Sequence, residues 1–138
     1  MEVQAKGLIT PNDVMCGNWV MDTRYDENFT KEINEYIQVT PRNLKYCGRW
    51  SPIPIDHDIL IKNEFNFIEN EWGTWNTYEK NINGFFFHIY TLSNGKDNHY
   101  VCHIDNQFHD NIMNISINYI HELQHIIKLC KINNDIVL

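Results

Sequence analysis

The feature that most constrains the fold is a pair of apolar, alternating segments at residues 85–92 ("FFFHIYTL") and 99–104 ("HYVCHI"). Both segments are rich in aromatic and β-branched residues, which favour strands. The polar stretch between them contains Asn94-Gly95, a dipeptide typical of two-residue hairpin turns. The two segments are therefore predicted to pair as an antiparallel hairpin.

A hairpin centred on this dipeptide gathers six apolar or amphipathic side chains on one face. The predicted opposite pairs are Phe85 with Ile104, Phe87 with Cys102, and Ile89 with Tyr100. A slip of one residue would mix the two faces, so this face is the expected core.

The other face of the predicted hairpin carries histidine and aromatic side chains. The predicted pairs there are Phe86 with His103, His88 with Val101, and Tyr90 with His99. Histidine rings often serve as neutral hydrogen-bonding groups on partly exposed faces, and the same groups can line a ligand cavity. The sequence leaves both interpretations open.

Alternation elsewhere predicts more strands and an all-β fold. The further segments are residues 18–25, 35–40, 43–47, 58–67 and 74–81. Residues 31–39 fit a short helix as well as a strand, and Pro52 and Pro54 favour a loop or an edge. We expect a single antiparallel domain over residues 1–138, closed as a small up-and-down barrel, because closure removes exposed strand edges.

Composition narrows the classes of partner. The net charge is -7 and the basic residues are scattered, so phosphate backbones and anionic membranes are poor candidates. No N-terminal segment resembles a signal peptide, and no apolar run has the length of a membrane span, so the expected location is the cytoplasm. The four cysteines lack a C-x-x-C spacing and are expected to be free thiols.

One short motif points to metal chemistry. Residues 121–125 read His-Glu-Leu-Gln-His, the H-E-x-x-H pattern of zinc peptidases. On a helix, His121 and His125 would share one face and bind zinc, and Glu122 would polarise the attacking water. The residues that follow contain neither His nor Glu as a third ligand. Zinc is therefore an alternative, and the main prediction is a chain without a cofactor.

The conformation of residues 111–132 decides whether this motif can work. A helix would align Ile120, Leu123 and Ile127 on one arc. A hairpin would instead use the alternation of residues 113–119 and return through residues 125–132. Because β-branched residues dominate, the hairpin is preferred, although residues 121–124 lack the residues typical of tight turns.

The order of features resembles the lipocalin and fatty-acid-binding (calycin) family. Gly17-Asn18-Trp19 leads into a predicted strand, consecutive antiparallel strands follow, and a last segment carries lysines. The resemblance implies a barrel in which Trp19 closes the base beneath Lys128 or Lys131. Its further motifs are missing, so the resemblance is specific only at Gly17 and Trp19.

The expected function is non-enzymatic binding of a small apolar or aromatic ligand inside the barrel. The residues expected to contact it are Trp72, Trp75, Tyr78, Phe86, His88, Tyr90 and His103. The alternatives are the zinc hydrolase described above and a viral or phage protein-interaction module. The viral alternative rests on Asn and Ile, each about one residue in seven, which suggests an AT-rich genome.

Overall fold

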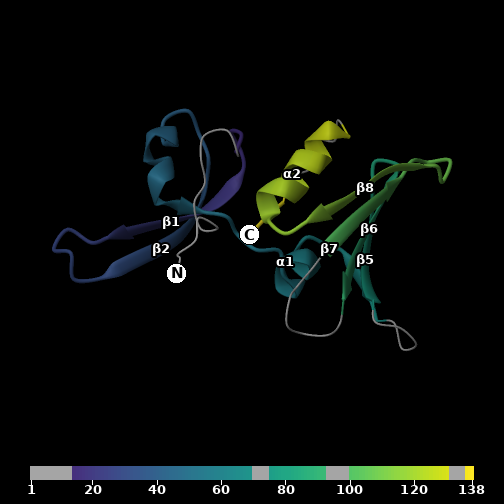
Figure 1. The fold of residues 1–138 in the computed structure, drawn as a ribbon, viewed down its shortest axis with the longest axis horizontal. Helices are drawn as coiled ribbons and strands as arrows, with labels where there is room; N and C mark the ends of the chain where they lie inside the picture. The colour runs from purple at the N-terminus through teal and green to yellow at the C-terminus, as the bar shows by residue number, and fades with distance from the viewer. Residues whose placement is uncertain (1–13, 70–74, 93–99, 131–135) are drawn as a thin grey trace. The chain divides into compact units, whose positions relative to one another are not determined.

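The computed structural model describes residues 14–69, 75–92, 100–130 and 136–138. The chain divides into two compact units, residues 1–54 with 119–121 and residues 55–118 with 122–138. Each unit contains one antiparallel sheet, and the predicted β-rich class is confirmed, in its alternative form with a C-terminal helix (Figure 1). That the units act as a single domain stays a prediction.

The first sheet has three strands in the order β2-β1-β3. Its strands are β1 (Trp19–Tyr25), β2 (Glu32–Gln38) and β3 (Trp50–Ser51). β2 falls within the segment that fitted a helix or a strand equally well. Its small core consists of Val14, Val20, Val39 and Trp50.

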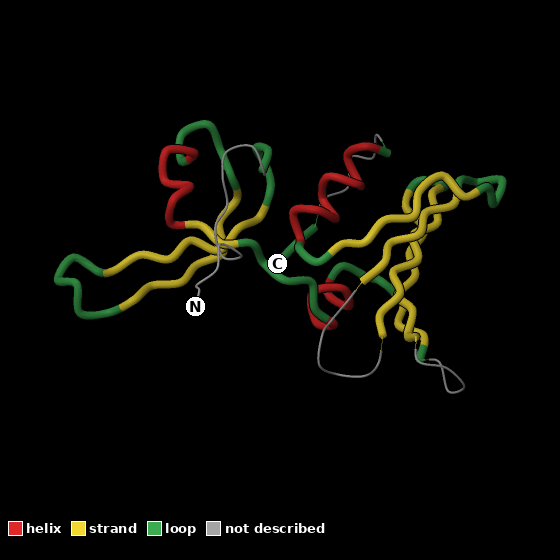
Figure 2. The backbone as a smooth tube through the Cα atoms, in the orientation of Figure 1, coloured by secondary structure: helices red, strands yellow, loops and turns green. Residues whose placement is uncertain are grey.

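The second sheet has five strands in the order β4-β5-β6-β7-β8. Its strands are β4 (Asn66–Ile68), β5 (Trp75–Ile82), β6 (Phe85–Leu92), β7 (Tyr100–Asp105) and β8 (Asn111–Ile117). Figure 2 shows these strands as one layer of neighbouring segments. No described pairing joins β4 to β8, so the described strands form an open sheet with two edges.

The five-stranded sheet has two chemically different faces. The helix α1 (His57–Lys62) and residues 122–129 of α2 (Ile120–Leu129) lie on one side of it (Figure 1). We call this side the core face, because its side chains in the central strands are fully buried. They include Phe87, Ile89, Cys102 and Ile104. We call the opposite side the outer face.

The hairpin of β6 and β7 has the predicted faces and a different register. Ile89 lies opposite Cys102 and Phe87 lies opposite Ile104, which is a shift of two residues from the predicted pairing. A shift of two moves each partner along the strand and leaves every side chain on its face, because side chains alternate with period two. Asn94-Gly95 lies outside the described residues.

A second Asn-Gly dipeptide forms a turn that was not predicted from the sequence. Asn83 and Gly84 connect β5 to β6, with Ile82 paired to Phe85 on either side. Their φ angles are 51° and 86°, as a two-residue turn with both central residues left-handed requires. This turn sets the register of the longest pairing in the sheet.

Two predicted strands are largely wrong. Residues 58–62 lie in α1, which begins after Asp56, whose side chain accepts a hydrogen bond from Ile59 N at 2.8 Å. Only residues 66 and 67 of this predicted strand lie in a strand, β4. Leu60, between the alternating isoleucines, is the residue that α1 buries. Residues 43–47 lie largely in the 3₁₀ helix η2 (Leu44–Arg49). In α1, helix capping by Asp56 and burial of Leu60 overrode the apparent alternation, whereas η2 has neither a side-chain cap nor a buried residue.

The C-terminal segment combines the two structures that the sequence suggested. Strand β8 ends at Ile117, and α2 follows at Ile120 where the hairpin return was preferred. Glu122 Oε1 accepts a hydrogen bond from Asn118 N at 2.9 Å, which satisfies a backbone donor at the helix start. The expected last strand with Lys128 is therefore a helix, and Lys131 lies outside the described residues.

Candidate ligand-binding face

The outer face is built by alternate residues of four strands. The cross-strand pairs place Thr77 opposite Tyr90, Glu79 opposite His88, and His88 opposite His103. Asn114 of β8 lies opposite His103 on its other side. Residues paired directly across a sheet point to the same side, so these groups meet on one surface.

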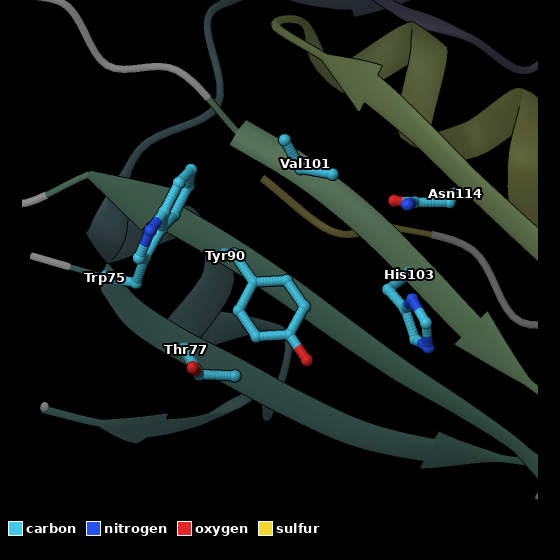
Figure 3. Close-up of a pocket in the computed structure, with 6 residues that line it drawn as sticks. All are labelled: Trp75, Thr77, Tyr90, Val101, His103 and Asn114. Atoms are coloured by element: carbon cyan, nitrogen blue, oxygen red, sulfur yellow. The ribbon is translucent and has the colours of Figure 1, made fainter. Parts of the chain in front are cut away.

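An open pocket lies on the outer face. Its cavity volume is about 480 Å³. Figure 3 shows the six lining side chains, Trp75, Thr77, Tyr90, Val101, His103 and Asn114. They come from β5, β6, β7 and β8, so the sheet forms the floor. Trp75 and Tyr90 supply ring surface, and His103 and Asn114 supply hydrogen-bonding groups.

Two histidines beside the pocket are held by carboxylates. Glu79 Oε1 lies 3.1 Å from Nδ1 of His88, and Asp105 Oδ2 lies 3.6 Å from its Nε2. Asp105 Oδ1 also lies 3.0 Å from Nε2 of His103. Asp105 therefore joins the two imidazole rings and restricts the rotation of both.

His103 is the member of this network that reaches the pocket. Besides its contact with Asp105, its Nδ1 lies 2.8 Å from Nδ2 of Asn111. The same amide nitrogen lies 2.9 Å from Nε2. The His103 ring is thus held by Asp105 of β7 and Asn111 of β8. These two residues therefore fix the edge of the pocket that His103 forms.

The rings of the outer face contact one another. The Tyr90 and His88 rings are stacked, with centroids 6.3 Å apart and planes 17° apart. Tyr90 meets His103 edge to face at 6.4 Å. Burial, with smaller contributions from Glu79 and Asp105, raises the pKa of Tyr90 above its ordinary value. Its hydroxyl therefore stays protonated at neutral pH and can donate a hydrogen bond.

Five of the seven predicted contact residues lie on the outer face, namely Trp75, Phe86, His88, Tyr90 and His103. Three of them, Trp75, Tyr90 and His103, line the pocket. Tyr78 lies on the core face opposite Ile89, where its hydroxyl is 2.8 Å from Nδ1 of His57. Trp72 lies outside the described residues. Phe86 is further along β6 and stacks on His109 at 5.4 Å.

The polar members of the face were not predicted from the sequence. Thr77, Glu79 and Asn114 reach it from strands whose pairing was not predicted, and Asp105 lies one residue beyond the predicted second strand of the hairpin. Alternation within β5 and β7 would have placed them on this side. Only the registers show that Asp105 lies between two histidines.

The H-E-x-x-H motif lies on α2, so His121 and His125 have helical spacing. Among the described residues, no group of three or more His, Cys, Asp or Glu side chains is arranged to hold a metal ion. Burial, followed by the charge of Lys128, lowers the pKa of His125, and Glu122 opposes this effect. The histidine is thus a neutral, half-buried group.

Cys47, Cys102 and Cys130 carry thiols that are not joined in disulfides. Cys102 is fully buried on the core face. Burial, with a smaller contribution from Cys130, raises its pKa to about 12, so the thiolate that nucleophilic chemistry needs is suppressed.

Comparisons with known proteins return no relatives. The chain matches no protein-family model, no curated protein and no solved structure. None of the described helices has the length and apolar composition needed to cross a bilayer. The conclusions about function therefore rest on the geometry of the chain.

Proposed function

We propose that the chain is a non-enzymatic binding protein that holds a small aromatic ligand on the outer face of the five-stranded sheet. The observation that carries this proposal is the open pocket of about 480 Å³ between Trp75, Tyr90 and His103. This volume lies within the range of small-molecule sites. The sequence predicted a ligand inside a closed barrel. The proposal here places the ligand on one face of an open sheet.

The lining favours a flat ring that carries a polar atom. Trp75 is 39% exposed, so part of its indole surface is open to solvent beside the Tyr90 ring. A planar ligand would stack on these rings and remove that surface from water. His103 and Asn114 would fix the orientation of its polar atom through hydrogen bonds.

The preorganised histidines support binding with a defined geometry. Glu79 and Asp105 already hold His88, and Asp105 and Asn111 hold His103. A side chain that is fixed before the ligand arrives loses less conformational entropy on binding. The network therefore favours recognition of one ring orientation.

The test is a titration of the protein with indole and 2-naphthol, followed by ¹H–¹⁵N NMR. We expect saturable shifts at the amides of Thr77, Tyr90 and Val101. The change Tyr90→Leu should weaken binding about tenfold, since it removes one ring and its hydroxyl. The matched control is Tyr36→Leu, an exposed tyrosine of β2 in the other sheet. Shifts that do not saturate, or equal losses in both variants, would reject the proposal.

The helical conformation of residues 120–129 supports a second candidate, a zinc hydrolase using His121, Glu122 and His125. It requires a third ligand, which the described residues do not group with these two histidines. Native mass spectrometry of the protein as purified tests it. A mass increase of one zinc ion that disappears in His121→Ala would support the hydrolase, and the bare chain mass after addition of zinc would eliminate it.

A further inference from the structure

A second pocket lies in the other unit of the chain, beside the three-stranded sheet. Its cavity volume is about 580 Å³. The lining residues are Thr23, Arg24, Tyr25, Phe29, Gly48 and Arg49. They come from β1, the turn after it and the end of η2. Two arginines and two aromatic residues therefore line one cavity, and none of its described lining residues is a carboxylate.

A buried carboxylate positions the two arginines. Asp22 is 1% exposed, and its carboxylate accepts hydrogen bonds from Arg24 Nη1 at 2.8 Å and from Arg49 Nε at 3.1 Å. A buried carboxylate requires such partners, because desolvation of an unpaired charge is costly. Two guanidinium groups share this one buried carboxylate, and the second carboxylate of the cluster, Glu35, contacts Arg24 from an exposed position.

The strand register explains how residues distant in the sequence meet here. Asp22 of β1 lies opposite Trp50 of β3, which directly follows Arg49. Because of this pairing, Arg49 at the end of η2 lies next to the buried carboxylate of Asp22. Arg49 also lies over the Tyr46 ring, with its Cζ 4.4 Å from the centroid, so its plane is held by a cation–π contact.

Both guanidinium groups keep donors for a further partner. In the described part of the chain, Arg49 uses Nε and Nη2 on Asp22, and Arg24 uses Nη1 on both Asp22 and Glu35. A guanidinium has five N–H donors in a fixed plane, which suits the paired oxygens of carboxylate and phosphate. The Glu35 side chain is 52% exposed, so its ion pair with Arg24 is screened and easily displaced.

The two aromatic residues that line the cavity indicate that the ligand has an apolar part in addition to a negative charge. Tyr25 is 60% exposed and Phe29 is 81% exposed. Exposed rings beside arginines are typical of recognition surfaces. The net charge of -7 disfavours long polyanions, so a small molecule fits better than a nucleic acid.

We infer that this pocket binds a small aromatic molecule carrying an oxyanion group. The oxyanion, a carboxylate or a phosphate, takes the free donors of Arg24 and Arg49, and the ring packs against Tyr25 and Phe29. The site lies in residues 1–54 and is independent of the function proposed for the five-stranded sheet.

The test uses four probes in ¹H–¹⁵N NMR titrations that include the arginine Nε–H signals. Benzoate and phenyl phosphate carry a ring and an oxyanion, inorganic phosphate lacks the ring, and benzyl alcohol lacks the charge. We expect saturable shifts at Gly48 and Arg49 with the first two, and affinities at least about tenfold weaker with the last two. The tighter of the first two identifies carboxylate or phosphate as the natural group.

Three variants and a control separate this site from general charge attraction. Gly48→Leu should abolish binding, because Gly48 lines the cavity and a larger side chain there would compete with the ligand for space. It should leave the chain folded, because a Cβ at Gly48 meets no atom within 4 Å. Arg49→Gln should weaken binding about tenfold or more. Glu35→Gln should tighten it about two- to fivefold by removing the competing carboxylate. Arg42→Gln, an exposed arginine outside the pocket, should change nothing.

Several outcomes would overturn the inference. Equal affinity for inorganic phosphate and phenyl phosphate would show that the ring contributes nothing to binding. Unchanged binding in Gly48→Leu would place the anion elsewhere. Shifts confined to Thr77 and Val101 would move the aromatic anion to the outer face of the other sheet and leave this pocket without a ligand.

Discussion

The core face and the outer face of the five-stranded sheet are made by the same strands and differ in nearly every property. On the core face, Phe87 and Ile89 are fully buried. On the outer face, the neighbouring residues His88 and Tyr90 are half-buried and hydrogen-bonded or stacked on polar groups. The buried side chains of the core face stabilise the fold, and the half-buried side chains of the outer face remain accessible to a ligand. The following predictions are designed to break or sharpen this difference.

The largest expected effect comes from truncating two adjacent phenylalanines of β6. Phe87→Ala should lower the free energy of unfolding by about 3–5 kcal/mol, because it leaves a cavity at a residue that is 0% exposed. Phe86→Ala should cost about 1 kcal/mol, since Phe86 mainly stacks on His109. Urea denaturation measures both. Equal losses would mean that the outer face is also part of a packed core.

The next effect concerns the turn that fixes which residues share a face. Gly84 has a φ of 86°, so Gly84→Ala should destabilise the chain by about 1–2 kcal/mol through backbone strain. The new Cβ would lie 3.8 Å from Gln107, at ordinary contact distance, so strain is the expected cause. Gly48→Ala is the control, because its Cβ meets open space and the change should stay within about 0.5 kcal/mol. If Gly84→Ala left the free energy of unfolding unchanged, the turn would be able to change its backbone conformation without cost.

The faces could be predicted from the sequence, because alternation is a local property of each strand. The predicted hairpin assigned Phe87 and Ile89 to the core and His88 and Tyr90 to the other side, as the structure shows. The same alternation is insensitive to a shift of two residues, so it gave the wrong partners. Register depends on turns and packing, and the Asn83-Gly84 turn is such a signal for the pairing of β5 with β6.

Other features depend on groups that are distant in the sequence. Arg24 and Arg49 look like isolated basic residues until β1 and β3 pair around Asp22. Asp105 lies between two histidines only in the observed register. In α1, the Asp56 cap outweighed an apparent alternation. The sequence therefore predicted the class of fold and one face of the site, and long-range pairing supplied the rest.

A smaller effect is expected from the carboxylate that joins the two outer-face histidines. Asp105→Asn should cost about 1 kcal/mol of stability, because its contacts with His88 and His103 lose their charge. It should also weaken binding of 2-naphthol, because His103 is then less well oriented. Asp110→Asn, an exposed carboxylate in the next turn, is the control for the charge change. Unchanged binding in Asp105→Asn would show that the network does not prepare the pocket.

The smallest effect is a pH dependence on the helix that lies on the core side. Burial and the nearby Lys128 lower the pKa of His125 in the folded chain, so the unfolded chain binds a proton more readily. The stabilising contribution of neutral His125 is complete above its unfolded pKa of about 6.5 and is lost as the pH falls towards the folded pKa. His125→Gln should therefore flatten the fall in stability below pH 6.5, measured by urea denaturation at pH 7.5, 6.5 and 5.5. If His125→Gln keeps the slope of the parent chain, groups other than His125 cause the acid sensitivity.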